Sequence, residues 1–248
     1  MNTIKVRNIE LGAGKPKICI PIVETNLEAI LDQARKIVKT KADLVELRVD
    51  WIDDLSDDNI KNIIKQLREI LKDMPILFTI RTKKEGGEKS FEIKDYLHIN
   101  KVAMETGLVD LVDVEIFTGD EEVKEMVGYA KENKVFLVGS NHDFDKTPSK
   151  EEIISRLNKM QDLGVDIPKI ALMPNSPKDV LTVLEATNEF RENFAKGPII
   201  TMSMGQLGVV SRLAGRTFGS SLTFASLEKA SAPGQISVED LYKILDII

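Results

Sequence analysis

Residues 135–173, VFLVGSNHDFDKTPSKEEIISRLNKMQDLGVDIPKIALM, contain one complete strand–helix–strand unit. The apolar run VFLVGSN (135–141) predicts a buried strand, an amphipathic helix is predicted over 149–163, and KIALM (169–173) predicts the next strand. Two strands joined by a crossover helix pair in parallel, because the helix returns the chain to the same end of the sheet. This unit therefore predicts an α/β fold built on a parallel sheet.

The same alternation runs along the whole chain in eight strand–helix units. The strands are predicted over 17–23, 44–49, 76–81, 111–115, 135–141, 169–173, 199–204 and 221–226. The helices after them are predicted over 26–39, 57–71, 91–106, 120–132, 149–163, 177–194, 206–213 and 237–247. Eight consecutive units in 248 residues favour a (β/α)8 TIM barrel over an open doubly wound sheet. We expect one barrel domain over 1–248, with a short N-terminal hairpin before Lys17 lying over one barrel end.

Composition excludes several classes of protein. Lys and Arg total 34 against 40 Asp and Glu, and the net charge of −6 argues against nonspecific nucleic-acid binding. The single cysteine, Cys19, excludes an intrachain disulfide, and its apolar surroundings indicate a core residue. No apolar stretch approaches the roughly 20 residues of a membrane span, and MNTIKVRNIELG (1–12) lacks the apolar region of a signal peptide. We therefore expect a cytoplasmic protein with no membrane partner.

Polar side chains are predicted to point into the barrel. Side chains alternate along a strand, so the apolar Val45, Leu47 and Val49 of LVELRVD (44–50) should face the helices. The polar residues then assigned to the lumen or its rim, here and on other strands, are Glu46, Arg48, Asp50, Arg81, Asp113, Glu115 and Lys169. Active sites of TIM barrels lie at the C-terminal ends of the strands, so this set predicts a polar pocket there.

The position of Lys169 along its predicted strand conflicts with a place in this pocket. The lysine heads the run KIALM (169–173), although pocket residues belong near strand ends. Either the strand begins before Pro168, or the side chain reaches upward along the lumen.

The two histidines receive different interpretations. His142 directly follows a predicted strand, where a barrel enzyme places an acid/base group. His98 lies within a predicted helix, which favours a surface or packing role. Asp143 and Asp145 beside His142 suggest a metal site, but the stretch lacks a second histidine or a cysteine, so no metal is predicted.

The inward lysine supports a definite chemistry. In a low-dielectric barrel near Arg48 and other cations, Lys169 would favour its neutral amine and could attack a ketone to form an imine. His142 could move the required protons, and Arg212 could bind a substrate carboxylate through a two-pronged contact. This reasoning does not select between aldol cleavage and dehydration.

Several motifs, in order, resemble one enzyme family over nearly the whole chain. They include SNHDF (140–144), PKIA (168–171), SMGQLGVVSRLAG (203–215) and SAPGQ (231–235). The chain resembles the type I 3-dehydroquinate dehydratases, Schiff-base enzymes of the shikimate pathway, which convert 3-dehydroquinate to 3-dehydroshikimate. The resemblance implies that Lys169 forms the imine, that His142 is the general acid/base, and that Glu85 orients His142. It also implies a homodimer and no cofactor.

The resemblance further assigns a set of substrate-binding positions. They are Glu46, Arg48, Arg81, Met202, Met204, Arg212, Phe224, Ser231 and Gln235. The chain departs from some relatives at Pro21, where they have a serine, and at Leu47, where a tryptophan is common. The loop over 228–237 is expected to act as a mobile lid.

Two alternatives stay open at this point. A class I aldolase or transaldolase would also use a lysine imine, but its substrates often carry phosphate, and the single glycine in the loop over 228–237 speaks against that. A noncatalytic barrel that only binds a carboxylic acid would not require Lys169 and His142 together.

Overall fold

Eight parallel strands form one sheet in the order β10-β3-β4-β5-β6-β7-β8-β9, which confirms the predicted (β/α)8 barrel. The computed structural model describes residues 2–227 and 231–248. The strands are β3 (Lys17–Ile22), β4 (Leu44–Arg48), β5 (Ile76–Thr79), β6 (Leu111–Glu115), β7 (Phe136–Asp143), β8 (Ile167–Leu172), β9 (Ile200–Ser203) and β10 (Leu222–Phe224). The ring closes between β9 and β10, where Ile199 bridges Ser220 and accepts a hydrogen bond from the Ser221 amide at 2.8 Å.

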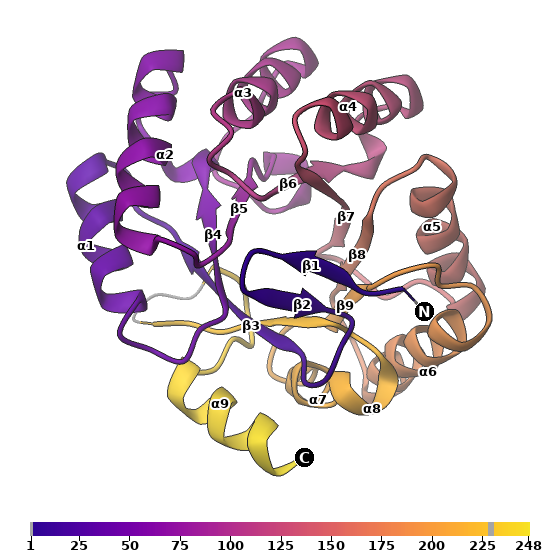
Figure 1. Cartoon of the computed structure of the whole chain (residues 1–248). Helices are drawn as coiled ribbons and strands as arrows, with labels where there is room; N and C mark the ends of the chain where they lie inside the picture. The colour runs from indigo at the N-terminus through magenta and orange to yellow at the C-terminus, as the bar shows by residue number, and fades with distance from the viewer. Residues whose placement is uncertain (1, 228–230) are drawn as a thin grey trace.

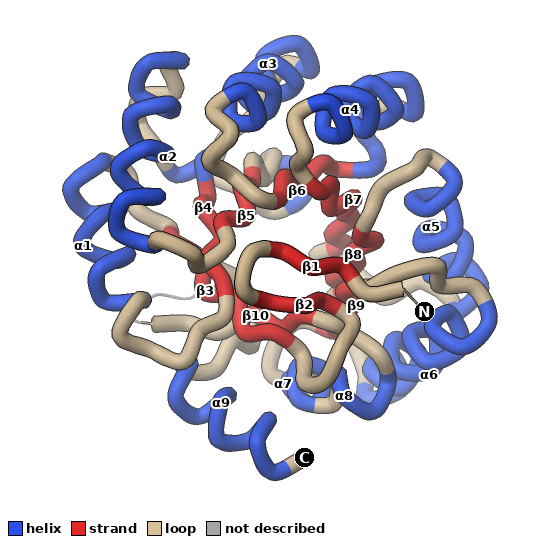
Figure 2. Tube along the Cα trace, viewed as in Figure 1, coloured by secondary structure: helices blue, strands red, loops and turns tan. Residues whose placement is uncertain are grey.

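Helices surround the strands in a ring, as Figures 1 and 2 show. They are α1 (Leu27–Ile37), α2 (Asp57–Leu71), α3 (Ile93–Glu105), α4 (Asp120–Glu132), α5 (Lys150–Asp162), α6 (Pro177–Asn193), α7 (Val209–Leu213), α8 (Gly215–Phe218) and α9 (Val238–Ile247). Short 3₁₀ turns follow three strands: η1 (Val49–Trp51), η2 (Lys83–Glu85) and η3 (Ile116–Thr118). None of the described helices combines the length and apolar character needed to cross a membrane.

The prediction of a helix over 206–213 is wrong at its N-terminal end, because α7 begins only at Val209. Residues before Val209 make a tight turn in which the Gly208 amide donates to the Gly205 carbonyl at 3.2 Å. A Cβ on Gly208 would lie 2.2 Å from the Ser203 carbonyl oxygen, so the turn presses directly onto the end of β9. The chain then forms two short helices, α7 and α8, and the sequence analysis did not predict α8.

The N-terminal segment forms the expected hairpin. Strands β1 (Ile4–Val6) and β2 (Ile9–Leu11) pair antiparallel and lie across the barrel in Figure 1. Val6, Ile9 and Leu11 join one apolar cluster with residues at the strand beginnings, including Leu44 and Leu111. The hairpin therefore closes the N-terminal mouth of the barrel and leaves the C-terminal end for a pocket.

The predicted alternation of side chains is confirmed. Val45 and Leu47 belong to the apolar cluster beneath the helices, whereas Leu44 belongs to the cluster inside the barrel. Cys19 is fully buried in that inner cluster, as expected of a core residue, and burial raises the pKa of its thiol.

Two strand boundaries change the interpretation of pocket residues. Strand β8 begins at Ile167, so Lys169 is its third residue, which confirms the first of the two alternatives for its height. Strand β7 runs to Asp143, so the prediction that His142 follows a strand is wrong. The reason is that β8 continues to pair with β7 through the partners of His142 and Asp143, Ala171 and Leu172.

Candidate active site

A cavity of about 460 Å³ opens at the C-terminal end of the barrel. It is lined by every residue that the family resemblance assigns to the site: Glu46, Arg48, Arg81, Glu85, His142, Lys169, Met202, Met204, Arg212, Phe224, Ser231 and Gln235. Asp50, Asp113 and Glu115, which strand alternation also assigned to the pocket, do not line it. Residues 228–230 of the expected lid lie outside the described part of the chain. The cavity is also lined by Gly86, Phe144 and Ala232, which the sequence analysis missed. Phe144 lies two residues after His142, so strand alternation was a signal that could have found it.

Lys169 lies at the floor of this cavity and is almost fully buried. Its Nζ donates to Asp113 Oδ2 at 2.9 Å and lies 3.7 Å from Glu46 Oε1. The ring of Phe224 covers the same nitrogen, with its centroid 4.9 Å away. The nearest charges to the amine are thus carboxylates, and not the cations expected from the sequence.

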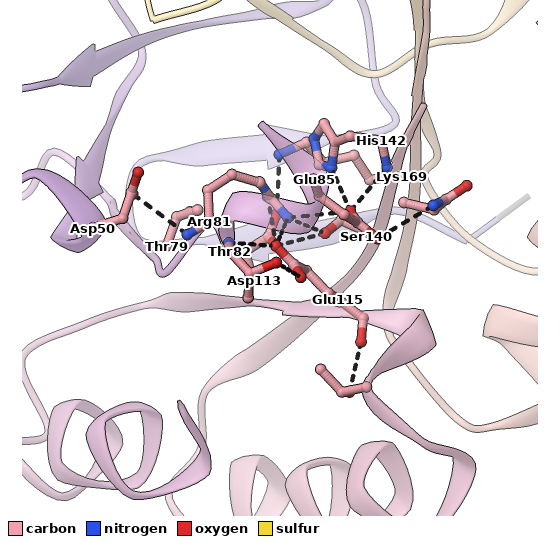
Figure 3. A network of polar contacts seen from close by, with 12 residues as sticks. Asp50, Thr79, Arg81, Thr82, Glu85, Asp113, Glu115, Ser140, His142 and Lys169 are labelled. Atoms are coloured by element: carbon pink, nitrogen blue, oxygen red, sulfur yellow. Dashed lines mark hydrogen bonds and ion pairs between the residues drawn. The ribbon is translucent and has the colours of Figure 1, made fainter. Parts of the chain in front are cut away.

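Asp113 connects Lys169 to a buried arginine (Figure 3). Its Oδ1 accepts from Arg81 Nη2 at 2.8 Å and from the Ser140 hydroxyl at 2.6 Å. Burial alone would raise the pKa of Asp113, but the charges of Arg81 and Lys169 lower it to about 2. Asp113 therefore stays ionised at neutral pH and holds a fixed negative charge beside the lysine.

The other cation of the floor, Arg81, is also fully engaged. Besides Asp113, its Nη1 donates to Glu115 Oε1 at 2.9 Å and to Ser140 Oγ at 3.0 Å. Burial opposes the charge of Arg81, but Asp113, Glu115 and Glu85 outweigh it and raise the pKa of the guanidinium. Arg81 thus organises the carboxylates on which Lys169 rests.

His142 and Glu85 form a buried pair above the lysine. Glu85 Oε2 accepts from the His142 amide at 2.9 Å and lies 2.9 Å from its Nδ1. Burial raises the pKa of Glu85 to about 8, although Arg81 opposes the shift. Burial also lowers the pKa of His142, and the positive charges of Arg81 and Lys169 lower it further. The imidazole is therefore neutral near pH 7, and its proton position depends on Glu85.

Arg212 is a buried cation with no counter-ion among the described residues. It is 2% exposed, its Nη2 donates to the Pro233 carbonyl at 3.1 Å, and its Nη1 lies 3.5 Å from the Met202 sulfur. It forms no ion pair within residues 2–227 and 231–248, and burial lowers its pKa to about 10. Such a group attracts an anion, because a bound carboxylate would restore its lost solvation.

The remaining predicted residues form the walls. Thr79 donates to Glu46 Oε1 at 3.0 Å, and Arg48 binds Asp50 with two nitrogens at 2.8 and 2.7 Å. Ser231 and Gln235 bind each other, the Ser231 amide donating to Gln235 Oε1 at 3.0 Å and the Gln235 amide donating to Ser231 Oγ at 2.9 Å. Met202, Met204 and Phe224, all buried, supply an apolar wall.

The two departures from the family pattern and the second histidine lie outside this cavity. Pro21 pairs with Glu46 in the β3–β4 register but does not line the pocket. Leu47 packs beneath the helices, as expected. His98 lies on the surface of α3 with Nε2 2.9 Å from Asp57, which confirms its surface role. Within the described part of the chain, no group of three or more His, Cys, Asp or Glu is arranged to hold a metal ion.

Fold and site together define a class: a (β/α)8-barrel enzyme with a buried lysine at the floor of a polar pocket. Comparison with known proteins narrows this class. Residues 18–248 match the model of the family described as type I 3-dehydroquinase. The chain belongs to this family.

Relatives match the chain over nearly their full length. The 3-dehydroquinate dehydratase of Shigella dysenteriae serotype 1 is 50% identical over 249 residues, covering 100% of this chain and 99% of the relative. The crystal structure of the type I enzyme from Clostridium difficile with covalently modified comenic acid superimposes with a TM-score of 0.96 at 48% identity, covering 99% and 97% of the two chains. The Enterococcus faecalis 3-dehydroquinate dehydratase gives a TM-score of 0.93 at 41% identity, covering 99% of each chain.

Proposed function

We propose that this protein converts 3-dehydroquinate to 3-dehydroshikimate through an imine on Lys169, in the shikimate pathway of aromatic amino acid biosynthesis. One observation carries the proposal: a buried lysine, a His–Glu pair and an arginine that pairs with no described carboxylate line the same cavity. Membership of the type I family favours dehydration over aldol cleavage. The structure of the Clostridium difficile relative contains covalently modified comenic acid, which supports covalent chemistry in this family.

The first step joins the lysine to the substrate. Lys169 loses a proton and attacks the C3 ketone, a carbon–nitrogen bond forms, and the carbonyl oxygen leaves as water to give a protonated imine. The positive charge of the ammonium is thus replaced by that of the iminium at the same place. Asp113, ionised and 2.9 Å from Nζ, stabilises both cations without having to move.

The second step eliminates water from the ring. The iminium draws electrons from the adjacent bond, so the proton at C2 becomes acidic, and His142 removes it through Nε2, the nitrogen not bound to Glu85. His142 then returns a proton to the C1 hydroxyl, which leaves as water while the C1–C2 double bond forms. Hydrolysis of the imine releases 3-dehydroshikimate and restores Lys169.

The remaining groups bind and orient the ring. Arg212 binds the substrate carboxylate, since it is the buried cation whose charge no described carboxylate offsets. Glu46, Arg48, Arg81, Ser231 and Gln235 contact the hydroxyls and the carboxylate. Met202, Met204 and Phe224 exclude water, which strengthens every charge interaction in the pocket.

Borohydride trapping tests the proposal directly. The protein is incubated with 3-dehydroquinate and sodium borohydride, and the digested peptides are analysed by mass spectrometry. The proposal requires a substrate-derived adduct on Lys169 and none on the exposed Lys61 or Lys65 of α2. A barrel that only binds the acid would give no adduct, and an aldolase would give cleavage products in place of an enone absorbing in the ultraviolet.

We also propose that the protein works in the cytoplasm as a homodimer without metal or organic cofactor. The iminium is itself the electron sink, so the chemistry needs no metal. Full activity after treatment with EDTA would support this, and light scattering coupled to size exclusion measures the oligomeric state.

A further inference from the structure

A second cavity lies on the outer side of the Glu85–His142 pair. It is bounded by η2, the start of α3, η3 and the end of β7, and it encloses, with its open mouth, about 880 Å³. The enclosed space that can hold water-sized molecules is about 300 Å³, at the lower end of the range of pockets that hold small organic molecules. The cavity is separate from the substrate pocket, since Lys169 and Arg212 line only the latter.

The two cavities share one wall. Glu85 and His142 line both, and Asn141 of the outer cavity donates to Glu85 Oε1 at 3.3 Å. Asn141 is in turn held by Arg156, whose Nη1 donates to its Oδ1 at 2.9 Å. A molecule in the outer cavity would therefore touch the groups that set the proton position on His142, from the side away from the substrate.

The chemistry of the outer cavity indicates its ligand. Phe117 and Ile93 line it with 56% and 46% of their surfaces exposed, and exposed apolar side chains gathered in a hollow mark a binding site. Lys83 and Lys84 also line it and form no ion pair with any described residue.

The carboxylates of the outer cavity are already engaged. Glu115 accepts from Thr82, whose amide and hydroxyl lie at 2.8 and 2.7 Å, and Glu85 is bound to His142. The free charges are thus positive, and Phe117 and Ile93 offer exposed apolar surface beside them. This combination suits a ring that carries one carboxylate.

We propose that the outer cavity binds a small aromatic or alicyclic monocarboxylate, which regulates the enzyme through the Glu85–His142 pair; the regulatory part rests on the function proposed above for that pair. The ring packs on Phe117 and Ile93, and the carboxylate binds Lys83 and Lys84. Because this ligand does not occupy the substrate pocket, it lowers kcat with little effect on KM. Any coupling to substrate binding is reciprocal, so substrate changes the ligand's affinity by the same factor.

Imidazole NMR provides the test, because the chain has only two histidines. Phenylacetate is titrated into ¹⁵N-histidine-labelled protein that carries Arg212→Gln, which removes the carboxylate anchor of the substrate pocket. The His142 imidazole signals should shift in a saturable manner, while those of His98 stay fixed. Benzylamine, which has the same ring and the opposite charge, should produce no shift.

Charge reversal then identifies the site. Added to the Arg212→Gln protein, Lys83→Glu/Lys84→Glu should weaken phenylacetate binding at least tenfold. In the wild-type background the same double substitution should leave basal kcat with 3-dehydroquinate unchanged. The matched control, Lys61→Glu/Lys65→Glu on the exposed face of α2, should bind phenylacetate like the parent. Absence of saturable shifts up to about 10 mM phenylacetate, a range that reaches millimolar affinities, would overturn the proposal. Shifts that survive charge reversal, or purely competitive inhibition of wild-type protein, would overturn it as well.

Discussion

Replacing Arg212 with methionine should change stability and substrate affinity in opposite directions. Arg212 is 2% exposed, and burial lowers the pKa of its guanidinium from 12.5 to about 10. At about 1.4 kcal/mol for each tenfold change in the ionisation equilibrium, keeping the guanidinium charged in the buried site costs about 3 kcal/mol. Methionine carries no charge and suits the surroundings of Met202, so the variant should recover part of this free energy.

The recovered free energy is reduced by one lost hydrogen bond. Arg212 Nη2 donates to the Pro233 carbonyl, and losing such a bond costs about 1 kcal/mol. We therefore expect the free energy of unfolding of the substrate-free protein to rise by about 1–2 kcal/mol. For a chain of 248 residues this raises Tm by about 2–8 °C. Urea denaturation and scanning calorimetry measure both quantities.

The same substitution should strongly lower the affinity for the substrate. Removing one partner of a buried charged contact costs about 2–5 kcal/mol, or about 30-fold to a few thousand-fold in affinity. The assay is kcat/KM for 3-dehydroquinate, followed by the absorbance of the enone product. The control is Arg35→Met on α1, whose side chain is 56% exposed and should affect neither quantity. A less stable Arg212→Met protein with unchanged KM would refute the reasoning.

Four further substitutions test other parts of the site. Lys169→Ala should abolish turnover while a nonreacting carboxylate analogue still binds, as calorimetry can show; near wild-type turnover would exclude the imine. His142→Ala should slow imine formation and release by about 10²–10⁴-fold without changing the circular dichroism spectrum, and unchanged single-turnover rates would count against its role. In wild-type protein the Glu85–His142 pair loses a proton as pH rises through about 8, so proton removal from C2 should accelerate up to that pH. In Glu85→Gln the rise in rate should occur at lower pH, because only His142 then titrates and its pKa is lowered. An unchanged pH–rate profile would contradict the role given to Glu85. Gly87→Ala should destabilise the loop after β5, since a Cβ there would lie 1.8 Å from the Arg81 carbonyl oxygen, and thermal unfolding measures the loss.

The barrel and the direction of its side chains were predictable because both depend on short-range periodicity. A period of two residues placed Glu46 in the lumen and Leu47 beneath the helices, and both placements are confirmed. Strand ends were less predictable, since they depend on the neighbouring strand. His142 belongs to β7 because β8 pairs along its whole length, and the sequence near His142 carries no sign of that partner.

The charge partners inside the barrel could not be predicted, and they decide which arginine is free to bind substrate. The carboxylate was assigned to Arg212 from the sequence, but no local pattern gave a physical reason to prefer it over Arg48 or Arg81. In the structure, Arg48 makes a two-pronged contact with Asp50, and Arg81 is held by Asp113 and by the neighbouring acidic side chains of the floor. These pairs follow from the register of parallel strands and the reach of long side chains, which no local pattern encodes. Because Arg48 and Arg81 are held by carboxylates and Arg212 pairs with none of the described ones, the desolvated charge of Arg212 is the one that an incoming carboxylate can neutralise.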